Sequence, residues 1–185
     1  MAFNISEFVS RGMPLGGARN SLFQVIIDTP PGVPNVGARF SVSCSAAQLP
    51  ESQLGVIPIR YFGRETKFAG FRTFQPWQVT VLNDEDFEIR HALETWSNLI
   101  NRHEANLRDP AFAGSSSYKA TGTVNQFGKT GQIIRSYEFV NIWPENIATI
   151  ELSWESAEQI EQFTVTWSYD YWKVVPPGNT GTLNV

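Results

Sequence analysis

The sequence has 185 residues, 42% of them hydrophobic and 17% charged, which favours a single folded domain over residues 1–185 and excludes a disordered chain. Fourteen basic and 18 acidic residues give a net charge of −4, which argues against stable binding to nucleic acid. No apolar run is long enough for a bilayer and no signal peptide is recognisable, so we expect a protein made in the cytoplasm that does not bind membranes.

The N-terminal segment is predicted to be flexible and to lead into two strands. Residues 1–19 contain a short helix pattern at 5–9 followed by glycines. Residues 22–28 are rich in strand formers and residues 40–49 alternate small polar and apolar groups, with a proline-rich loop between them. We therefore predict a hairpin with a long loop, in which Cys44 is a buried thiol.

The middle of the chain predicts a second hairpin, a strand and one helix. Glycine and proline break residues 48–70 into short strand-like pieces, and apolar groups then alternate from Trp77 to Val81. A helix is expected over residues 84–101, capped by Asn83 and with acidic residues near the positive end of its dipole. Its buried stripe is predicted to contain Ile89, Leu93, Trp96 and Ile100.

The C-terminal part predicts further strands. Residues 118–127 and 132–140 flank a glycine-rich turn. A bend at residues 143–146 should precede a strand through Ile150, Leu152 and Trp154, and the alternation from Phe163 to Tyr171 predicts one long final strand. Residues 174–185 are rich in proline and glycine and should be flexible.

No catalytic, metal or cofactor site is predicted, and we expect a protein that is not an enzyme. His91 and His103 are the only histidines, and neither has a partner at zinc-type spacing. The aromatic residues suit a core better than a stacking platform, because most tryptophans fall on the apolar phase of their predicted elements. These tryptophans are Trp77, Trp96, Trp154 and Trp167.

Seven short motifs, in matching order from about residue 20 to residue 172, carry a family resemblance. They lie at residues 22–25, 47–50, 72–74, 77–84, 143–146, 163–166 and 170–172. With these motifs the sequence resembles the tail tube proteins of contractile-tailed bacteriophages, which are related in fold to the inner tubes of type VI secretion and other contractile injection systems. The long loop at 29–37 and the extension beyond residue 172 depart from that pattern.

The resemblance implies a mainly β fold, an antiparallel barrel or sandwich with one flanking helix at about 84–101 and an extended hairpin at about 48–70. It also implies a structural protein of the virion tail, with homo-hexamer rings stacked into a tube through which DNA passes transiently into the host. The implied partners are the tail sheath protein, the baseplate or tube initiator proteins and the tail terminator.

The resemblance further suggests which residues make contacts between subunits and rings, namely the hairpin and the N-terminal segment. Exposed strand edges and uncovered apolar groups are hazards in a monomer that neighbouring copies can satisfy. The acidic balance suits a channel that lets DNA slide, with Glu138, Glu151 and Asp170 as candidate lumen-facing residues. The candidate contact residues are Phe3, Phe8, Leu49, Pro50, Leu54, Val56, Ile57, Tyr61 and Phe62.

Three other functions stay open at this point. The first is an inner tube of a type VI or extracellular contractile injection system, which would deliver proteins. The second, from a different class, is a carbohydrate-binding β sandwich that uses exposed tryptophans and stays monomeric. The third is a hydrolase with a dispersed active site around the two histidines.

Overall fold

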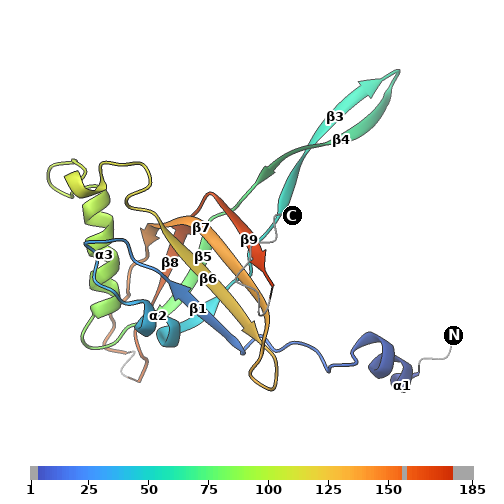
Figure 1. The fold of residues 1–185 in the computed structure, drawn as a ribbon, viewed down its shortest axis with the longest axis horizontal. Coiled ribbons are helices and arrows are strands. Elements are labelled where there is room, and N and C mark those ends of the chain that lie inside the picture. Colours follow the sequence, from blue (N-terminus) through green and yellow to red (C-terminus); the bar gives the residue numbers. More distant parts are fainter. Residues whose placement is uncertain (1–3, 156–157, 177–185) are drawn as a thin grey trace.

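The computed structural model describes residues 4–155 and 158–176, and its regular elements are mostly strands (Figure 1). Helical elements are α1 (Ile5–Glu7), which continues as a π turn (Phe8–Gly12), α2 (Gly37–Ser43), α3 (Glu88–Ile100) and a 3-10 turn (Pro110–Phe112). The strands are β1 (Phe23–Ile27), β2 (Cys44–Ala47), β3 (Gln53–Tyr61), β4 (Arg64–Thr73), β5 (Trp77–Leu82), β6 (Ala120–Phe127), β7 (Ile133–Ile147), β8 (Gln162–Ser168) and β9 (Tyr171–Val175).

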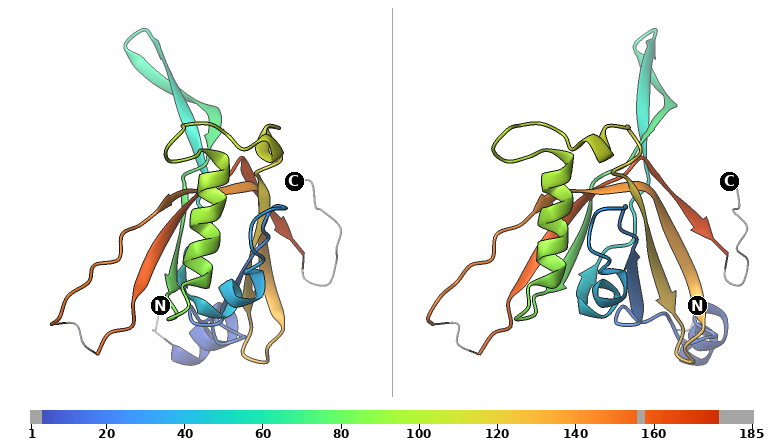
Figure 2. Two further views of the ribbon diagram at one scale, coloured as in Figure 1. Left: turned by 90° about the vertical axis from the view of Figure 1, so that its left-hand side faces the viewer. Right: turned by 60° about the vertical axis from the view of Figure 1, so that its left-hand side comes forward.

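Seven strands form one antiparallel sheet in the order β1-β6-β7-β8-β5-β2, and β9 pairs with β7. The long strand β7 belongs to two layers, because residues 136–140 pair with β9 and residues 143–147 pair with β8. The layers diverge from β7, and α3 lies between their open sides (Figure 2). The predicted mainly β antiparallel fold, with a flanking helix and an extended hairpin, is therefore confirmed.

The core between the layers is strongly aromatic. Trp167 contacts Trp96 edge to face with ring centroids 5.7 Å apart, and it meets Phe40 in the same way at 6.1 Å. Trp77 stacks on Phe139 with centroids 4.3 Å apart. Because aromatic side chains bury large areas, these few contacts join both layers, α2 and α3 into one core.

The helix α3 shows both a confirmed and a wrong prediction. Its stripe is buried as expected at Ile89, Leu93 and Trp96, but the helix begins at Glu88 and Asn83 does not cap it. The Asn83 amide instead donates to Glu161 at 2.8 Å. The first helical turn is bonded by Asp86, whose carboxylate accepts from the backbone N–H of Glu88 at 3.1 Å.

The acidic residues before α3 are held by an arginine from a distant part of the chain. Arg39 of α2 forms ion pairs with Asp84 (3.3 Å), Asp86 and Glu88. The hydrogen bond from the Arg39 guanidinium lowers the pKa of Asp86 below its ordinary value. A local capping pattern does not include a partner 47 residues away, such as Arg39 for Asp86. The helix start predicted from the sequence was therefore too early.

The predicted strand over residues 40–49 is wrong in its first half. Residues Gly37–Ser43 form α2, and Val36 and Phe40, four residues apart, are both buried as on one helical face. Val42 is exposed, and Cys44 is only half-buried at the start of β2. The predicted hairpin between residues 22–28 and 40–49 is also wrong, because β1 pairs with β6 and β2 pairs with β5.

Three corrections concern the C-terminal strands. Residues 143–146 are no bend before a strand but the end of β7, with a register shift at Pro144. Residues 148–155 and 158–161 form no strand, and the side chains of Leu152 and Trp154 are exposed. The single strand predicted over 163–171 is two strands, β8 and β9, divided at Asp170.

The flexibility of the two terminal segments stays a prediction. Residues 1–3 and 177–185 lie outside the described residues, and with them most of the predicted flexible tail. Within the described chain, no helix is long and apolar enough to span a membrane.

Candidate assembly surfaces

The most prominent surface feature is the β3–β4 hairpin, which projects from the core as a separate two-stranded sheet (Figure 1). The register places Ile57 opposite Phe68 and Ile59 opposite Thr66 on one face. About half of each of these large side chains is exposed: Ile57 47%, Ile59 52% and Phe68 53%. An apolar face that nothing in the described subunit covers is typical of a protein contact.

The tip of the hairpin is a two-residue turn with an unusual backbone. Phe62 and Gly63 both have positive φ angles, 45° and 79°, which matches the tight turns that favour right-handed strand twist. Glycine adopts this conformation freely, but phenylalanine does so at a cost. The Phe62 ring packs edge to face on that of Tyr61 with centroids 4.5 Å apart, yet its side chain stays 89% exposed, so the subunit leaves most of this strained tip uncovered.

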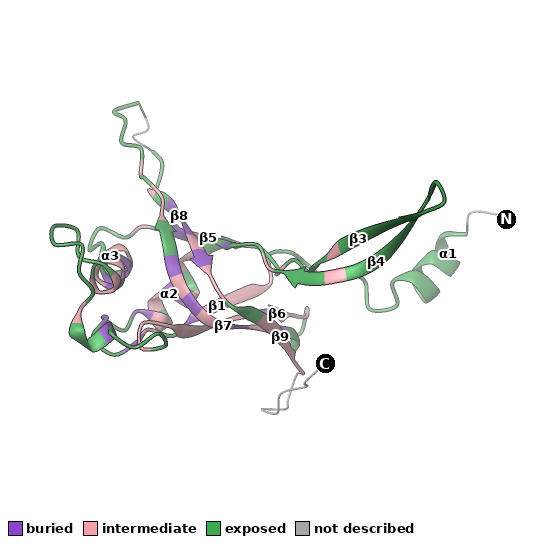
Figure 3. Ribbon diagram, turned by 90° about the horizontal axis from the view of Figure 1, so that it is seen from above, coloured by how far each residue is buried: buried purple, intermediate pink, exposed green. Residues whose placement is uncertain are grey.

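The base of the hairpin is bent and anchored. Gly55 and Gly70 face one another beside a register shift, and a Cβ on Gly70 would lie 3.2 Å from the carbonyl carbon of Gly55. A core tryptophan and a partly buried one hold the segment that leads in: Trp77 donates to the carbonyl of Gln48 at 2.7 Å and Trp172 to that of Glu51 at 2.9 Å. The hairpin is therefore fixed at its base and uncovered along its length (Figure 3).

All the contact residues predicted in this region lie where a partner could reach them. Leu49 is half exposed and Pro50 partly exposed in the lead-in, ahead of the strands. Leu54, Val56, Ile57, Tyr61 and Phe62 are all exposed on the hairpin. Their role in assembly stays a prediction.

The N-terminal segment forms a second projecting arm. None of the residues in α1 and the π turn after it is buried, and Phe8 and Val9 are each 56% exposed. A side-chain contact ties this arm to the β6–β7 turn, where Lys129 donates to the carbonyl of Gly16 at 3.0 Å. Phe3, the other predicted contact residue of the arm, lies outside the described residues.

The loop between β7 and β8 is a surface that the sequence reasoning missed. Leu152 and Trp154 were expected in a half-buried strand, yet they are 81% and 101% exposed. The sequence did contain a signal, because residues 148–162 include four glutamates and no lysine or arginine. Glutamate side chains are almost never fully buried unless they are paired, so a short segment with this many of them is a poor candidate for a core strand.

The three candidate lumen-facing acids do not form one group. Glu138 of β7 pairs with Lys173 of β9 at 2.7 Å. Asp170 accepts from Asn141 at 2.6 Å and pairs with Lys119 at 3.1 Å, and these contacts hold its pKa below the ordinary range. Glu151 lies apart from both, exposed in the β7–β8 loop.

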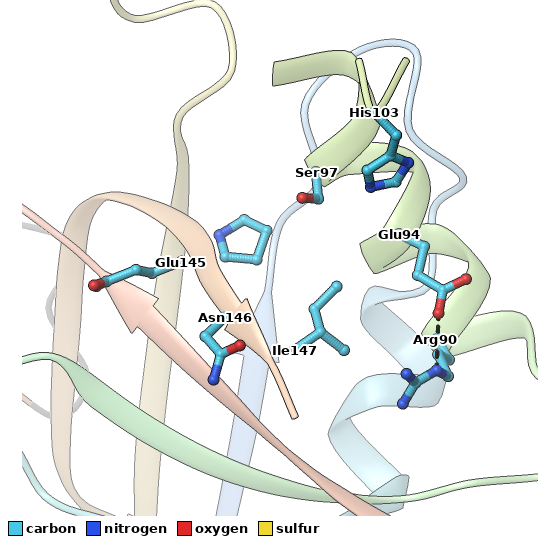
Figure 4. A pocket seen from close by; sticks show the side chains of 8 residues that line it. Arg90, Glu94, Ser97, His103, Glu145, Asn146 and Ile147 are labelled. Atoms are coloured by element: carbon cyan, nitrogen blue, oxygen red, sulfur yellow. Dashed lines mark hydrogen bonds and ion pairs between the residues drawn. The ribbon is translucent and has the colours of Figure 1, made fainter. Parts of the chain in front are cut away.

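A shallow pocket of about 340 Å³ lies between α3 and the end of β7 (Figure 4). The Arg90 guanidinium fills one side, where it bonds Glu94 at 2.8 Å and the carbonyl of Ala148 at 3.2 Å. Arg90 also lies over the ring of Phe163, so its contacts are those of a structural side chain. His103 and Ser97 line the same pocket.

The part of the chain that the structure describes contains no candidate metal-binding site. No three side chains from His, Cys, Asp and Glu gather there in a way that could hold an ion. The surfaces available for function are thus the two arms, the β7–β8 loop and the strand edges.

Comparison with known proteins gives consistent matches over most of the chain. Residues 15–175 match the family described as phage tail tube protein. The chain is 32% identical over 159 residues to the tail tube protein gp19 of Enterobacteria phage T4, an alignment that covers 84% of this chain and 91% of that protein.

Two solved structures share the fold at lower identity. A chain from the anti-feeding prophage baseplate has a TM-score of 0.62 at 13% identity, covering 86% of this chain and 96% of that chain. A chain from the sheath–tube complex of an extracellular contractile injection system, PVC, has a TM-score of 0.55 at 13% identity, covering 95% and 99%.

Proposed function

Because this chain belongs to the phage tail tube protein family, we propose that it is a structural protein of the virion tail. Its copies close into hexameric rings, and the rings stack into the inner tail tube through which DNA passes into the host. The protein is made in the host cytoplasm. The role is mechanical, so the proposal assigns it no catalytic residue, metal or cofactor.

The observation that carries this proposal is the amphipathic β3–β4 hairpin. Its apolar face, with Ile57, Ile59 and Phe68, is half exposed, and an isolated two-stranded hairpin is only marginally stable in water. A neighbouring copy that covers this face would remove apolar area from water and order the hairpin at the same time. We assign Leu54, Val56, Tyr61 and Phe62 to contacts of the same hairpin with neighbouring copies, Val56 from its opposite face, with Leu49 and Pro50 at the edge.

The strand edges support closure into a ring. Among the described strands, β1 pairs only with β6, β2 only with β5 and β9 only with β7. Each therefore leaves one row of backbone N–H and C=O groups without a strand partner, which a strand from another copy can fill. A head-to-tail contact of this kind closes a ring, and a second contact along the axis extends it into a tube.

For the channel wall we propose a surface without excess positive charge. The ion pairs of Glu138 with Lys173 and of Asp170 with Lys119 balance acidic and basic groups around β9. A wall of this kind does not hold phosphates through counterion release, so DNA can slide past it. Glu151 stays a lumen candidate only on sequence grounds.

We further propose the sheath, the baseplate or tube initiator and the tail terminator as partners. The inner tube of an injection system is the second candidate, since the same fold occurs in the PVC sheath–tube complex. The relative from phage T4 is 32% identical, against 13% for that structure, and this difference favours the phage tail.

Negative-stain microscopy of the purified protein over a concentration series tests the proposal. Rings or tubes with sixfold end views are the expected result. Uniform monomers at every concentration would refute it, and a shift of tryptophan fluorescence on adding sugars would favour the carbohydrate-binding alternative.

A further inference from the structure

The β7–β8 loop combines exposed apolar groups with unpaired acidic groups. Leu152, Trp154 and Ile160 are 81%, 101% and 71% exposed, far more than is usual for side chains of this size. The nearby glutamates are exposed too, and within the described residues those at 151, 155 and 158 form no ion pair. We call this set the loop patch: Glu151, Leu152, Trp154, Glu155, Glu158 and Ile160.

The β3–β4 hairpin has the opposite charge. Residues 53–73 contain four basic residues and one acidic residue, Glu65, which is engaged by Arg60 at 3.5 Å. Arg64 and Lys67, close to the tip, make no ion pair with any described residue. The tip therefore presents unpaired positive charge beside exposed apolar groups such as Tyr61, which is 74% exposed.

The two surfaces lie at opposite ends of the subunit, with the hairpin tip at one end and the loop at the other (Figures 1 and 2). They cannot meet within one copy. A copy displaced along that direction, however, brings its loop patch toward the hairpin of the first. Two different surfaces that match in this way form a heterologous contact, which repeats without closing and builds a filament.

We propose that the hairpin tip of one copy docks on the loop patch of a second copy in the adjacent ring. Arg64, on the same face of the hairpin as Tyr61, faces the glutamates of the loop while Tyr61 covers Trp154, and Lys67 adds positive charge from the other face. The apolar groups supply most of the affinity, while the charges set the orientation and the association rate. The inference rests on the tube function proposed above, and it gives Glu151 a role in stacking as an alternative to lining the channel.

Charge reversal tests this contact because it separates pairing from folding. Glu151→Lys/Glu155→Lys and Arg64→Glu/Lys67→Glu each place like charges together, and each should raise the protein concentration needed for tubes at least tenfold. Combining all four changes in one chain restores opposite charges at every contact and should restore tubes. The matched control is Glu85→Lys/Glu104→Lys, which reverses two exposed glutamates outside both surfaces and should assemble like the wild type.

A second measurement follows Trp154 directly. It is the one tryptophan of the described chain that is fully exposed, so iodide should quench its fluorescence in the monomer and lose access to it in tubes. Trp154→Phe should abolish this difference while circular dichroism confirms the fold. The proposed contact would be refuted if either charge-reversal variant formed tubes at the wild-type concentration. It would also be refuted if the chain with all four changes formed no tubes. Neither result would refute the tube function itself. Wild-type protein that never forms rings or tubes would refute the proposed function, and this contact with it.

Discussion

Replacing two isoleucines on the apolar face of the hairpin should stop ring stacking and leave the subunit folded. Ile57→Thr/Ile59→Thr keeps side chains branched at Cβ, so the strand preference of β3 changes little. Both isoleucines are about half exposed in the subunit, at 47% and 52%. Full burial of such a side chain is worth about 1.5–3 kcal/mol, so covering the remaining half contributes roughly 1 kcal/mol each.

The loss of about 2 kcal/mol per contact weakens a single hairpin contact about 30-fold. A hexameric ring repeats the contact in every subunit, so the loss per stacked ring reaches about 12 kcal/mol if all contacts form together. Stacking should therefore disappear at concentrations where the wild type forms long tubes. Single rings, which form through the strand edges, should persist.

Sedimentation velocity and negative-stain microscopy measure the outcome, and thermal unfolding followed by circular dichroism checks the fold. The matched control is Val42→Thr/Leu107→Thr, which changes two side chains that are 80% and 64% exposed outside the hairpin. Tubes of normal length from the hairpin variant would show that its apolar face is not an assembly surface. Equal loss of tubes in the control would refute the assignment to this face.

Three further predictions concern the subunit itself. Arg39→Ala should lower the melting temperature at pH 7; because the pKa of Asp86 is depressed in the folded state, this deficit should vanish as pH falls below the ordinary value of 3.8 in thermal melts. Trp96→Ala should cost about 3–5 kcal/mol in denaturant titrations, since it removes the edge-to-face contact with Trp167 and a 2.8 Å hydrogen bond to the carbonyl of Tyr118. Burial raises the pKa of Cys44 to about 11, so thiol labelling at pH 8 should be much slower in the folded than in the unfolded protein; its stability contribution should fall as pH rises from about 9 toward 11.

The sequence predicted elements well where one face packs inside the same subunit. Trp77, Val79 and Val81 alternate because β5 faces the core on one side, and the α3 stripe is buried for the same reason. Strand partners were not predictable in this way, since β1 pairs with β6 about a hundred residues later. Alternation reports which side chains can share a face, and it contains no information about which strand lies alongside.

The failed strand over residues 150–154 shows where pattern reasoning reaches its limit. Ile150, Leu152 and Trp154 have the spacing of a half-buried strand, yet they pair with no strand among the residues that the structure describes. The exposed hairpin was easier to predict, because glycine and proline divide it visibly. The spacing of apolar groups looks the same in an exposed loop as in a core strand, and here only the glutamates of residues 148–162 argue against burial.

The anchoring of the hairpin base bears on the proposed assembly contact, because it sets the direction of an arm that has few contacts of its own. The indole N–H groups of Trp77 and Trp172 donate to the carbonyls of Gln48 and Glu51, so the lead-in is tied to the body of the subunit although its side chains are largely exposed. A segment whose direction is already set loses less conformational entropy when it docks than a free tail would. The strands beyond Gly55 and Gly70 pair only with one another, and under the proposed assembly a partner would cover them. If the hairpin docks as proposed, Trp77 and Trp172 therefore influence assembly through the hairpin base, because they set the direction of its uncovered apolar face.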